Sequence, residues 1–312
     1  MEAGVEVAPL PGATRKRTSG GSLDASRARL AWLLILPSLI VVVVVALYPL
    51  IQTFLLSFTN TRLASAREPR NVGVDNYVDL LTEPLFRSAL MNTVVFTVAS
   101  VFFETLLGLA IALVIHSNFR GRGGVRTAML VPWAIPTVVS ASMWAWMYHD
   151  VFGVVNDLLV YRLHILDEKV AWLANPATAL PAIIAVDVWK TTPFMALLLL
   201  AGLQLIPGDV YEASRVDGAS RLQQFYQITL PLLKPALLVA LIFRTLDAFR
   251  VFDVIFVMKG YATETMTVAV YARQQLIDLA RLGRGSAAAV IIFVCIFAFV
   301  ILYTRLVKVE EV

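Results

Sequence analysis

The sequence predicts an all-α membrane protein with six transmembrane helices. Of its 312 residues, 59% are hydrophobic and 15% are charged, whereas soluble domains carry about 25% charged residues. Six apolar segments are each long enough to cross a bilayer, which takes about 20 residues of helix. Because backbone polar groups in lipid must pair within their own segment, every span is expected to be helical.

The first span is Leu30–Phe58, a run of 29 residues without a charge. The apolar part of a signal peptide has only about 7–15 residues, so we expect this span to be retained. The sequence LASA at Leu63–Ala66 is a weak match to a cleavage site. Residues 1–29 form a polar tail rich in Gly, Ser, Ala and Arg. A tail of this composition cannot bury a core and is expected to be disordered.

Five further spans are predicted at about residues 89–116, 125–149, 179–206, 231–258 and 285–307. The expected organisation is a tail at 1–29, a transmembrane domain at 30–308 and a C-terminus at 309–312. An even number of spans puts both termini on the same side of the membrane. Basic residues before the first span favour the cytoplasm for that side; they are Arg15, Lys16, Arg17, Arg27 and Arg29.

Seven charged residues lie well inside the predicted spans, away from the span ends, and a charge at the bilayer centre costs about 2.5–3.5 kcal/mol. They are Glu104, Asp187, Lys190, Arg244, Asp247, Arg250 and Asp253. Asp187 and Lys190 can pair across one helical turn, and residues 244–253 alternate in sign every three positions. Glu104 is the one charge without a possible partner in its own helix.

Two interpretations of these charges stay open. They can hold helices together as ion pairs, or they can line a polar cavity for a hydrophilic solute. Asp187, Lys190, Thr191 and Phe194 form one narrow stripe on a helix. A sugar would suit such a cavity because its hydroxyls form hydrogen bonds and its ring faces stack on aromatic side chains such as Trp189.

Several motifs for enzymatic chemistry are absent from the sequence. There is no G-x-x-x-x-G-K-[ST] loop for ATP and no G-x-S-x-G serine motif. His116, His149 and His164 lack metal-ligand spacing, and the single Cys295 cannot form an intramolecular disulfide. An aspartyl protease is disfavoured because Asp187 has a basic neighbour, which favours an ionised pair over a shared proton. No basic stripe with interleaved aromatics suggests nucleic acid. We therefore expect a transport protein without catalytic residues, metal or bound cofactor.

A polar segment at residues 207–231 separates the fourth and fifth spans. It begins GDVYEASRVDGASRLQQFYQ and predicts two short amphipathic helices joined at Gly218, with Pro207 and Pro231 ending the flanking spans. Membrane-surface helices are usually richer in Lys and Arg. Docking into a protein partner therefore fits this segment better.

The same segment carries a family pattern. Glu212-Ala213-Ser214, Gly218 and Ile228-x-Leu230-Pro231 follow the spacing E-A-A-x3-G-x9-I-x-L-P, with Ser214 for the second alanine. The segment resembles the EAA loop of ABC importer permeases. The resemblance covers about residues 30–307. The segments VRTAMLVPWAIPTVV, DVWKTTPFM and FRTLDAFRVFD resemble the carbohydrate branch of the family, in particular permeases for maltose or trehalose. The large periplasmic insertion and extra N-terminal spans of the enterobacterial maltose permease are missing.

The resemblance implies a six-helix permease of the bacterial or archaeal cell membrane with a cytoplasmic EAA helix pair. It implies as partners a second, similar permease, two ATP-binding subunits that use ATP and Mg, and an external sugar-binding protein. The coupling residues would be Glu212, Ala213, Ser214, Asp217, Gly218, Ile228 and Pro231. The sugar-contacting positions of maltose-type permeases fall on Asp187, Lys190, Thr191, Phe194, Asp247 and Arg250.

The expected function is therefore uptake of an α-linked disaccharide such as trehalose or maltose. The alternative is an ion-coupled secondary transporter that uses the intramembrane Asp, Lys and Arg as coupling groups. The EAA loop favours the importer because an ion-coupled carrier has no use for an ATPase dock. Export, or a different solute such as an amino acid, also stays open. So does the question whether Asp247 and Arg250 bind sugar or pair with each other.

Overall fold

The computed structural model describes residues 20–63, 65 and 68–306, and for residues 20–26 and 306 it describes the backbone alone. The predicted disordered tail lies outside the described residues as far as residue 19, and so do the predicted C-terminus at 309–312 and both alanines of LASA. From Gly20 onward the chain is helical. The first helix therefore begins ten residues before the predicted span at Leu30.

The chain divides into two compact units, Met1–Gln52 and Thr53–Val312. The first unit contains α1 (Gly20–Val42), which continues through a π-helical turn, η1 (Val43–Leu47), into α2 (Tyr48–Leu56). The last four residues of α2 belong to the second unit. The uninterrupted helix Arg27–Leu56 is apolar and long enough to cross a membrane. The predicted first span is thus confirmed as a membrane-spanning candidate.

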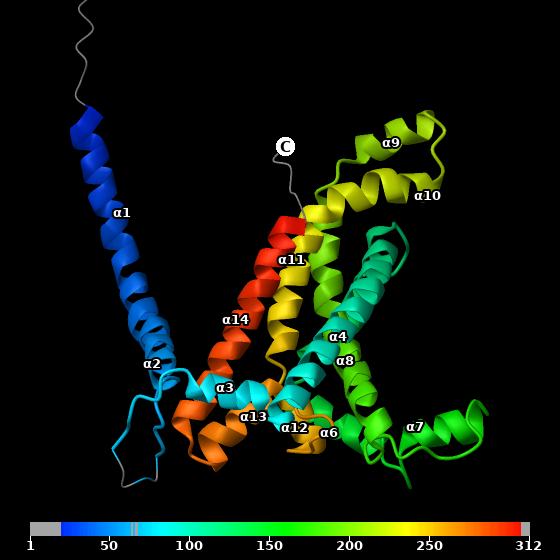
Figure 1. The fold of residues 1–312 in the computed structure, drawn as a ribbon. Helices are drawn as coiled ribbons and strands as arrows, with labels where there is room; N and C mark the ends of the chain where they lie inside the picture. The colour runs from blue at the N-terminus through cyan, green and yellow to red at the C-terminus, as the bar shows by residue number, and fades with distance from the viewer. Residues whose placement is uncertain (1–19, 64, 66–67, 307–312) are drawn as a thin grey trace, which may run out of the picture. The chain divides into compact units, whose positions relative to one another are not determined.

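The second unit is built on four long helices. They are α4 (Pro84–His116), α8 (Pro176–Gln204), α11 (Leu230–Phe249) and α14 (Leu282–Leu306). Shorter helices gather near one end of these (Figure 1): α3 (Asp75–Thr82), α12 (Asp253–Lys259) and α13 (Val268–Arg273), the last followed by the π-helical η4 (Gln274–Asp278). The connection between α6 and α8 contains α7 (Val154–Asn156) and η2 (Asp157–Arg162). Among the described residues there are five candidate spans, or six if the bent pair described next is one span.

The third predicted span is not one straight helix. It consists of α5 (Arg122–Ala134) and α6 (Thr137–Met147), which meet at an angle of 89°. Between them, Ile135 and Pro136 are extended, with ψ values of 132° and 139°. The residue before a proline is driven out of the α region by the proline ring, so Pro136 explains the interruption.

The fifth predicted span is interrupted at one end and prolonged at the other. Its helix stops at Phe249, and α12 begins at Asp253, where the sequence predicted a continuous helix. At the other end, α11 continues from α10 (Arg221–Gln224) through the π-helical η3 (Phe225–Thr229). Pro231 therefore does not end the span as predicted. It is the second residue of α11, directly after η3, and a local π-helical adjustment of this kind accommodates a proline within a continuing helix.

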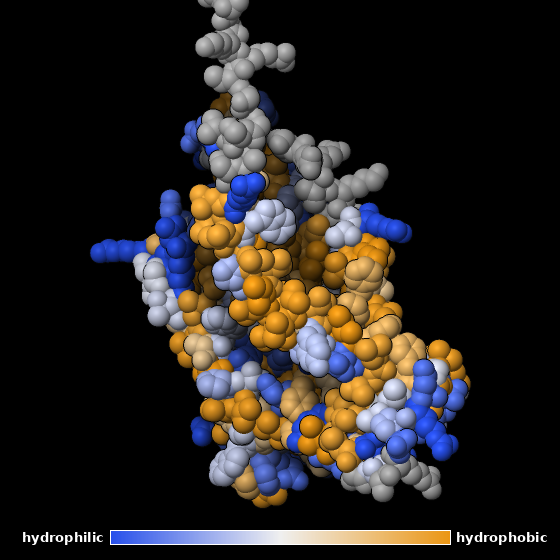
Figure 2. All heavy atoms as spheres, turned by 90° about the vertical axis from the view of Figure 1, so that its left-hand side faces the viewer, coloured by the Kyte–Doolittle hydropathy of each residue, from blue (hydrophilic) through white to orange (hydrophobic). Residues whose placement is uncertain are grey.

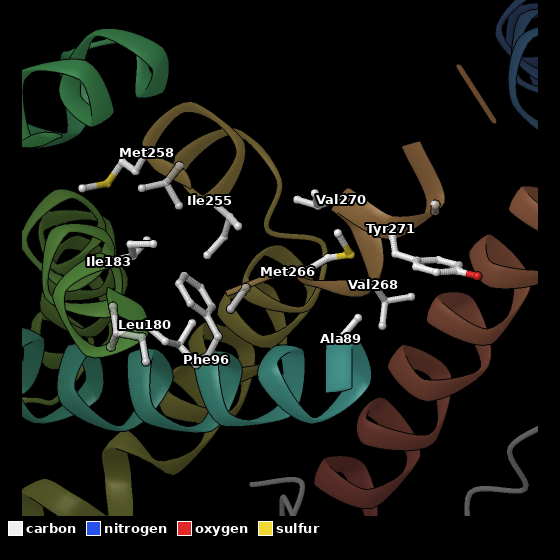
Figure 3. Close-up of a cluster of buried hydrophobic side chains, with 14 of the residues drawn as sticks. Ala89, Phe96, Leu180, Ile183, Ile255, Met258, Met266, Val268, Val270 and Tyr271 are labelled. Atoms are coloured by element: carbon white, nitrogen blue, oxygen red, sulfur yellow. The ribbon is translucent and has the colours of Figure 1, made fainter. Parts of the chain in front are cut away.

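Two apolar clusters hold the long helices together. Figure 3 shows the larger one, in which Phe96 of α4 and Ile183 of α8 lie near Ile255 of α12 and residues around α13. The smaller cluster joins α4, α8 and α11, and includes Ile115 and Leu199. Burial of these side chains attaches α12 and α13 to α4 and α8, and thereby fixes the position of the interrupted end of α11.

Close helix packing within the smaller cluster depends on glycine. A Cβ atom at Gly202 of α8 would lie 2.3 Å from the Cβ of Ala236 in α11, and one at Gly108 of α4 would lie 2.7 Å from Cγ of Met195 in α8. Small residues at such crossings allow membrane helices to approach closely. On the face that Figure 2 shows, hydrophobic side chains predominate in the middle and hydrophilic ones gather towards its upper and lower ends. This distribution is the one expected of a membrane protein.

Candidate functional site

A polar cavity of about 260 Å³ lies where the two helix interruptions come together. Its lining comes from α5, α6, α8, α11 and α12: Trp133, Thr137, Asp187, Lys190, Thr191, Arg244, Asp247, Ala248, Arg250, Val251, Phe252, Asp253 and Val254. Non-helical backbone at membrane depth is tolerated where it is buried in protein or lines a water-filled space. The break in α11 lies directly in this lining, and the bend between α5 and α6 lies between two lining residues.

A backbone carbonyl group at the break in α11 receives its hydrogen bond from a distant part of the chain. The carbonyl oxygen of Val251 accepts a hydrogen bond of 3.0 Å from Oγ1 of Thr267. Thr267 also caps α13, where its side chain accepts from the backbone N–H of Val270. The helix can therefore end at the cavity without leaving this carbonyl group unpaired.

Arg244 is the centre of a buried network of charges. Its side chain is 2% exposed and contacts three carboxylates. Nη2 donates hydrogen bonds of 2.7 Å to Oε1 of Glu104 on α4 and to Oδ2 of Asp187 on α8. Nε donates to the other oxygen of Glu104, and Nη1 donates to Oδ2 of Asp247 at 2.7 Å. One guanidinium thus ties three helices together at the cavity.

The network lies where one apolar cluster gives way to the other. Along α11, Ala240 belongs to the smaller cluster and Ala248 to the larger, with Arg244 between them. Glu104 likewise follows Val101 and precedes Ala112 along α4. The charges of Arg244 and Glu104 therefore lie between two apolar clusters, while the side chain of Asp247 is 67% exposed.

Five of the six predicted sugar-binding residues line the cavity. They are Asp187, Lys190, Thr191, Asp247 and Arg250. Phe194 is absent from the lining and lies behind Trp133, with the two rings 6.1 Å apart and nearly parallel at 11°. Trp189, the other aromatic candidate, packs against Trp144 instead.

The ion pairs differ in part from those that helical spacing predicts. Asp187 pairs with Arg244 of another helix, while Nζ of Lys190 donates to the carbonyl oxygen of Trp133 at 3.4 Å. The predicted pair within α11, Arg244 with Asp247, is confirmed. Arg250 instead donates to the backbone oxygen of Leu246. Helical spacing identifies possible partners, but the helix packing selects the pairs that form.

Sequence reasoning missed several lining residues. Trp133 and Thr137 flank the bend at Pro136, and the segment VPWAIPT contains the proline signal that could have marked this place. Phe252 and Asp253 border the break in α11, for which the sequence gives no proline or glycine. The resulting cavity combines carboxylates, cations, hydroxyl groups and two aromatic rings, which is a suitable lining for a polar solute with an apolar ring face.

The polar segment before α11 forms the predicted pair of short helices. α9 (Gly208–Val216) and α10 are separated by Gly218, whose φ of +82° is in the left-handed region. Gly218 accordingly makes the turn between them. Ser220 caps α10 through a capping box with Gln223. Figure 1 shows this pair at the opposite end of the unit from α12 and α13.

The side chains of this helix pair are largely exposed. Val216, Leu222 and Tyr226 are exposed apolar residues. The side chain of Glu212 is 74% exposed, and its nearest cation is Arg215 at 3.8 Å. The helix pair therefore presents apolar groups and a weakly paired acid at its surface.

The sequence is similar to a known family of membrane transport proteins. Residues 104–309 match the family of binding-protein-dependent transport system inner membrane components. The trehalose/maltose transport system permease protein MalF of Thermococcus litoralis is 44% identical over 288 residues, which cover 91% of this chain and 95% of that protein. The sulfoquinovosyl glycerol transport system permease protein SmoG of Agrobacterium fabrum is 38% identical, covering 93% and 94%.

A solved structure has the same fold. A chain of the bacterial alginate ABC transporter, in complex with its alginate pentasaccharide-bound periplasmic protein, superposes with a TM-score of 0.80. Its sequence identity is 25%, and the match covers 94% of this chain and all of that one. Relatives of this kind are transport subunits, with ATP hydrolysis on a separate chain. The chain belongs to the family of binding-protein-dependent transport system inner membrane components and is a permease subunit of a carbohydrate ABC importer.

Proposed function

We propose that this chain forms half of the translocation path of an importer for an α-linked disaccharide such as trehalose or maltose. The observation that carries this proposal is the cavity at the break in α11, where Asp187, Lys190, Thr191 and Asp247 lie beside Trp133. Carboxylates, an ammonium group and a hydroxyl supply donors and acceptors for sugar hydroxyls. The 44% identity to a trehalose/maltose permease supports the same class of sugar.

In this proposal the cavity charges have two different roles. Arg244 holds its three carboxylates and has little capacity left for a ligand. Lys190, Arg250 and the exposed side of Asp247 are available to sugar hydroxyls. This division reconciles the two interpretations of the charges, because the same cluster both joins helices and borders the solute path.

The proposed dock for the ATP-binding subunit is the α9–α10 pair, with Glu212, Ala213, Ser214, Asp217, Gly218, Ile228 and Pro231 as the coupling residues. The exposure of Glu212 and of the apolar residues around it supports this assignment. ATP and Mg would be bound by two partner ATPase subunits, whose closure would alternate access to the cavity. The other partners would be a second permease and an external sugar-binding protein. Both termini would then be cytoplasmic, on the side of the α9–α10 pair.

The complete complex, reconstituted with its binding protein, provides the test of the substrate. We expect ATP hydrolysis to be stimulated when trehalose or maltose is added, and not by an unrelated amino acid. The panel should include sulfoquinovosyl glycerol and an alginate oligosaccharide, because related systems carry anionic sugars. Stimulation by an anionic sugar alone would move the proposal to that class. Stimulation by the amino acid alone would reject a sugar substrate.

Asp187→Asn is expected to lower sugar uptake about tenfold or more while the complex still assembles. The change removes one charged acceptor from the cavity, and a tenfold loss corresponds to about 1.4 kcal/mol. Arg244 keeps Glu104 and Asp247 as partners, so the helices should stay joined. Uptake into liposomes and size-exclusion chromatography of the complex measure the two effects. A variant that fails to assemble would show that Asp187 serves mainly to hold helices together.

A further inference from the structure

The cavity lining contains two aromatic residues, Trp133 and Phe252, within the part of the chain that the structure describes. Phe252 lies between α11 and α12, with φ of −132° and ψ of −61°, outside any helix. Its backbone conformation therefore depends on the contacts around the break. A half-buried ring beside so many charges and hydroxyls is poorly placed for packing alone.

Each of these two rings is supported from behind by a nearly parallel ring. Phe252 stacks on Phe256 with centroids 5.2 Å apart and an angle of 16°. Trp133 stacks on Phe194 in the same manner, at 11°. Parallel support restricts the tilt of the ring that lines the cavity. The cavity thus presents two aromatic faces whose orientations are fixed in advance, which lowers the entropic cost of binding a flat ligand face.

The support of Phe252 continues to a charged residue outside the cavity. The guanidinium carbon of Arg273 lies 4.5 Å from the ring centroid of Phe256 and 5.9 Å from that of Phe252. Arg273 donates hydrogen bonds to Asp278 at 3.2 Å and to the hydroxyl oxygen of Tyr261. These contacts hold the cation over the rings, where the negative face of an aromatic ring attracts it.

We propose that Phe252 is a sugar-stacking residue of the translocation cavity and that Arg273 is a positioning residue that fixes its ring through Phe256. This inference rests on the proposed function, because it requires a substrate with a sugar ring. The pyranose ring has an apolar face of C–H groups, which packs on an aromatic face while its hydroxyls reach the charged residues. Asp253, next in the chain and also in the lining, can accept from such a hydroxyl.

The test uses the complete complex in liposomes with its binding protein, radiolabelled trehalose or maltose, and ATP hydrolysis measured on the same samples. Phe252→Ala is expected to reduce the sugar imported per ATP about tenfold, while hydrolysis stimulated by loaded binding protein changes less than about twofold. Phe252→Tyr and Phe252→Trp should stay within about twofold of wild type. A merely structural role would lower uptake and hydrolysis together.

The positioning role of Arg273 is tested by comparing its methionine and lysine variants. Arg273→Met should reduce the sugar imported per ATP about two- to fivefold, and Arg273→Lys should restore most of it because the cation over the rings returns. Phe293→Ala is the matched control. Its ring forms a similar parallel stack with Phe297, at 6.4 Å and 8°, but it is exposed and outside the cavity lining. This control should import sugar as the wild type does.

Besides a joint loss of uptake and hydrolysis, two results would overturn the inference without contradicting the proposed function. The first is wild-type import per ATP by Phe252→Ala. The second is an equal loss in Phe252→Ala and in both aromatic variants, because stacking would then not be the property that matters. A wild-type complex that imports neither sugar would reject the proposed function, and this inference with it.

Discussion

Replacing Arg244 by methionine is expected to abolish transport and to destabilise the protein strongly. The guanidinium is 2% exposed and is shared by Glu104, Asp187 and Asp247. Without it, Glu104 would remain fully buried without a cation. Removing one partner of a buried ion pair typically costs about 3–5 kcal/mol. The loss should appear as a lower unfolding temperature of the purified protein, together with absent sugar uptake.

Three further variants sharpen this prediction. Arg250→Met also removes a cation from the cavity, but Arg250 is exposed and bonds to a backbone oxygen, so its stability should stay near wild type. Arg244→Lys should recover part of the stability, because lysine restores charge but not the fork of donors. A double change, Glu104→Met with Arg244→Met, should also be more stable than Arg244→Met, since an apolar pair can replace a buried ion pair. Wild-type stability of Arg244→Met would contradict the role given to the network.

Glu212→Lys is expected to abolish ATP-driven uptake, by about a hundredfold or more, without disturbing the fold. Its side chain is 74% exposed, and the pair with Arg215 spans 3.8 Å. An exposed pair of this kind contributes about 0–1 kcal/mol, so insertion and folding should be unaffected. In the proposed dock Glu212 pairs with a basic group of the ATPase, so reversing its charge would replace attraction by repulsion at that interface. Co-purification of the ATPase subunit and sugar uptake are the two measurements.

Asp209→Lys provides the matched control for this second prediction. Asp209 lies in the same helix, is also exposed and is outside the E-A-A spacing. It should retain most of the uptake. If Glu212→Lys co-purifies with the ATPase and transports normally, α9 does not dock through this acid. An equal loss in Asp209→Lys would assign the effect to the overall charge of α9 rather than to one position.

Most of the fold could be predicted from the sequence because lipid imposes a simple rule. Long uncharged segments must be helices, and the helices α4, α8 and α14 end within a few residues of the predictions. The helix pair α9 and α10 could also be predicted, since Gly218 and the residue spacing around it are local signals. The interruption of α11 could not, because the segment has no proline or glycine and the carbonyl group of Val251 finds its partner in Thr267, sixteen positions away. Neither residue marks that break in a sequence.

The candidate site was predictable in location but not in detail. Charges in an apolar segment identify the helices that face a polar space, and Asp187, Lys190 and Asp247 indeed line it. Spacing along one helix could not show that Asp187 pairs with Arg244, since this pairing depends on how α8 packs against α11. For the same reason Phe194 was expected in the cavity, whereas Trp133 of α5 occupies the position in front of it.

The helical continuity from α10 into α11 has a mechanical consequence. Arg221 and Arg244 are separated by about 35 Å of helix at 1.5 Å per residue, and no loop between them can absorb a displacement. A force applied to α10 would act on one continuous helix, which carries Arg244 and its three carboxylate partners near the other end. Between those points the helix can bend at the π-helical η3 and at Pro231 and Pro235, because π-helical turns and prolines are the usual sites of helix kinks. The stiffness of residues 225–235 would then determine how much of a displacement of α10 reaches the cavity.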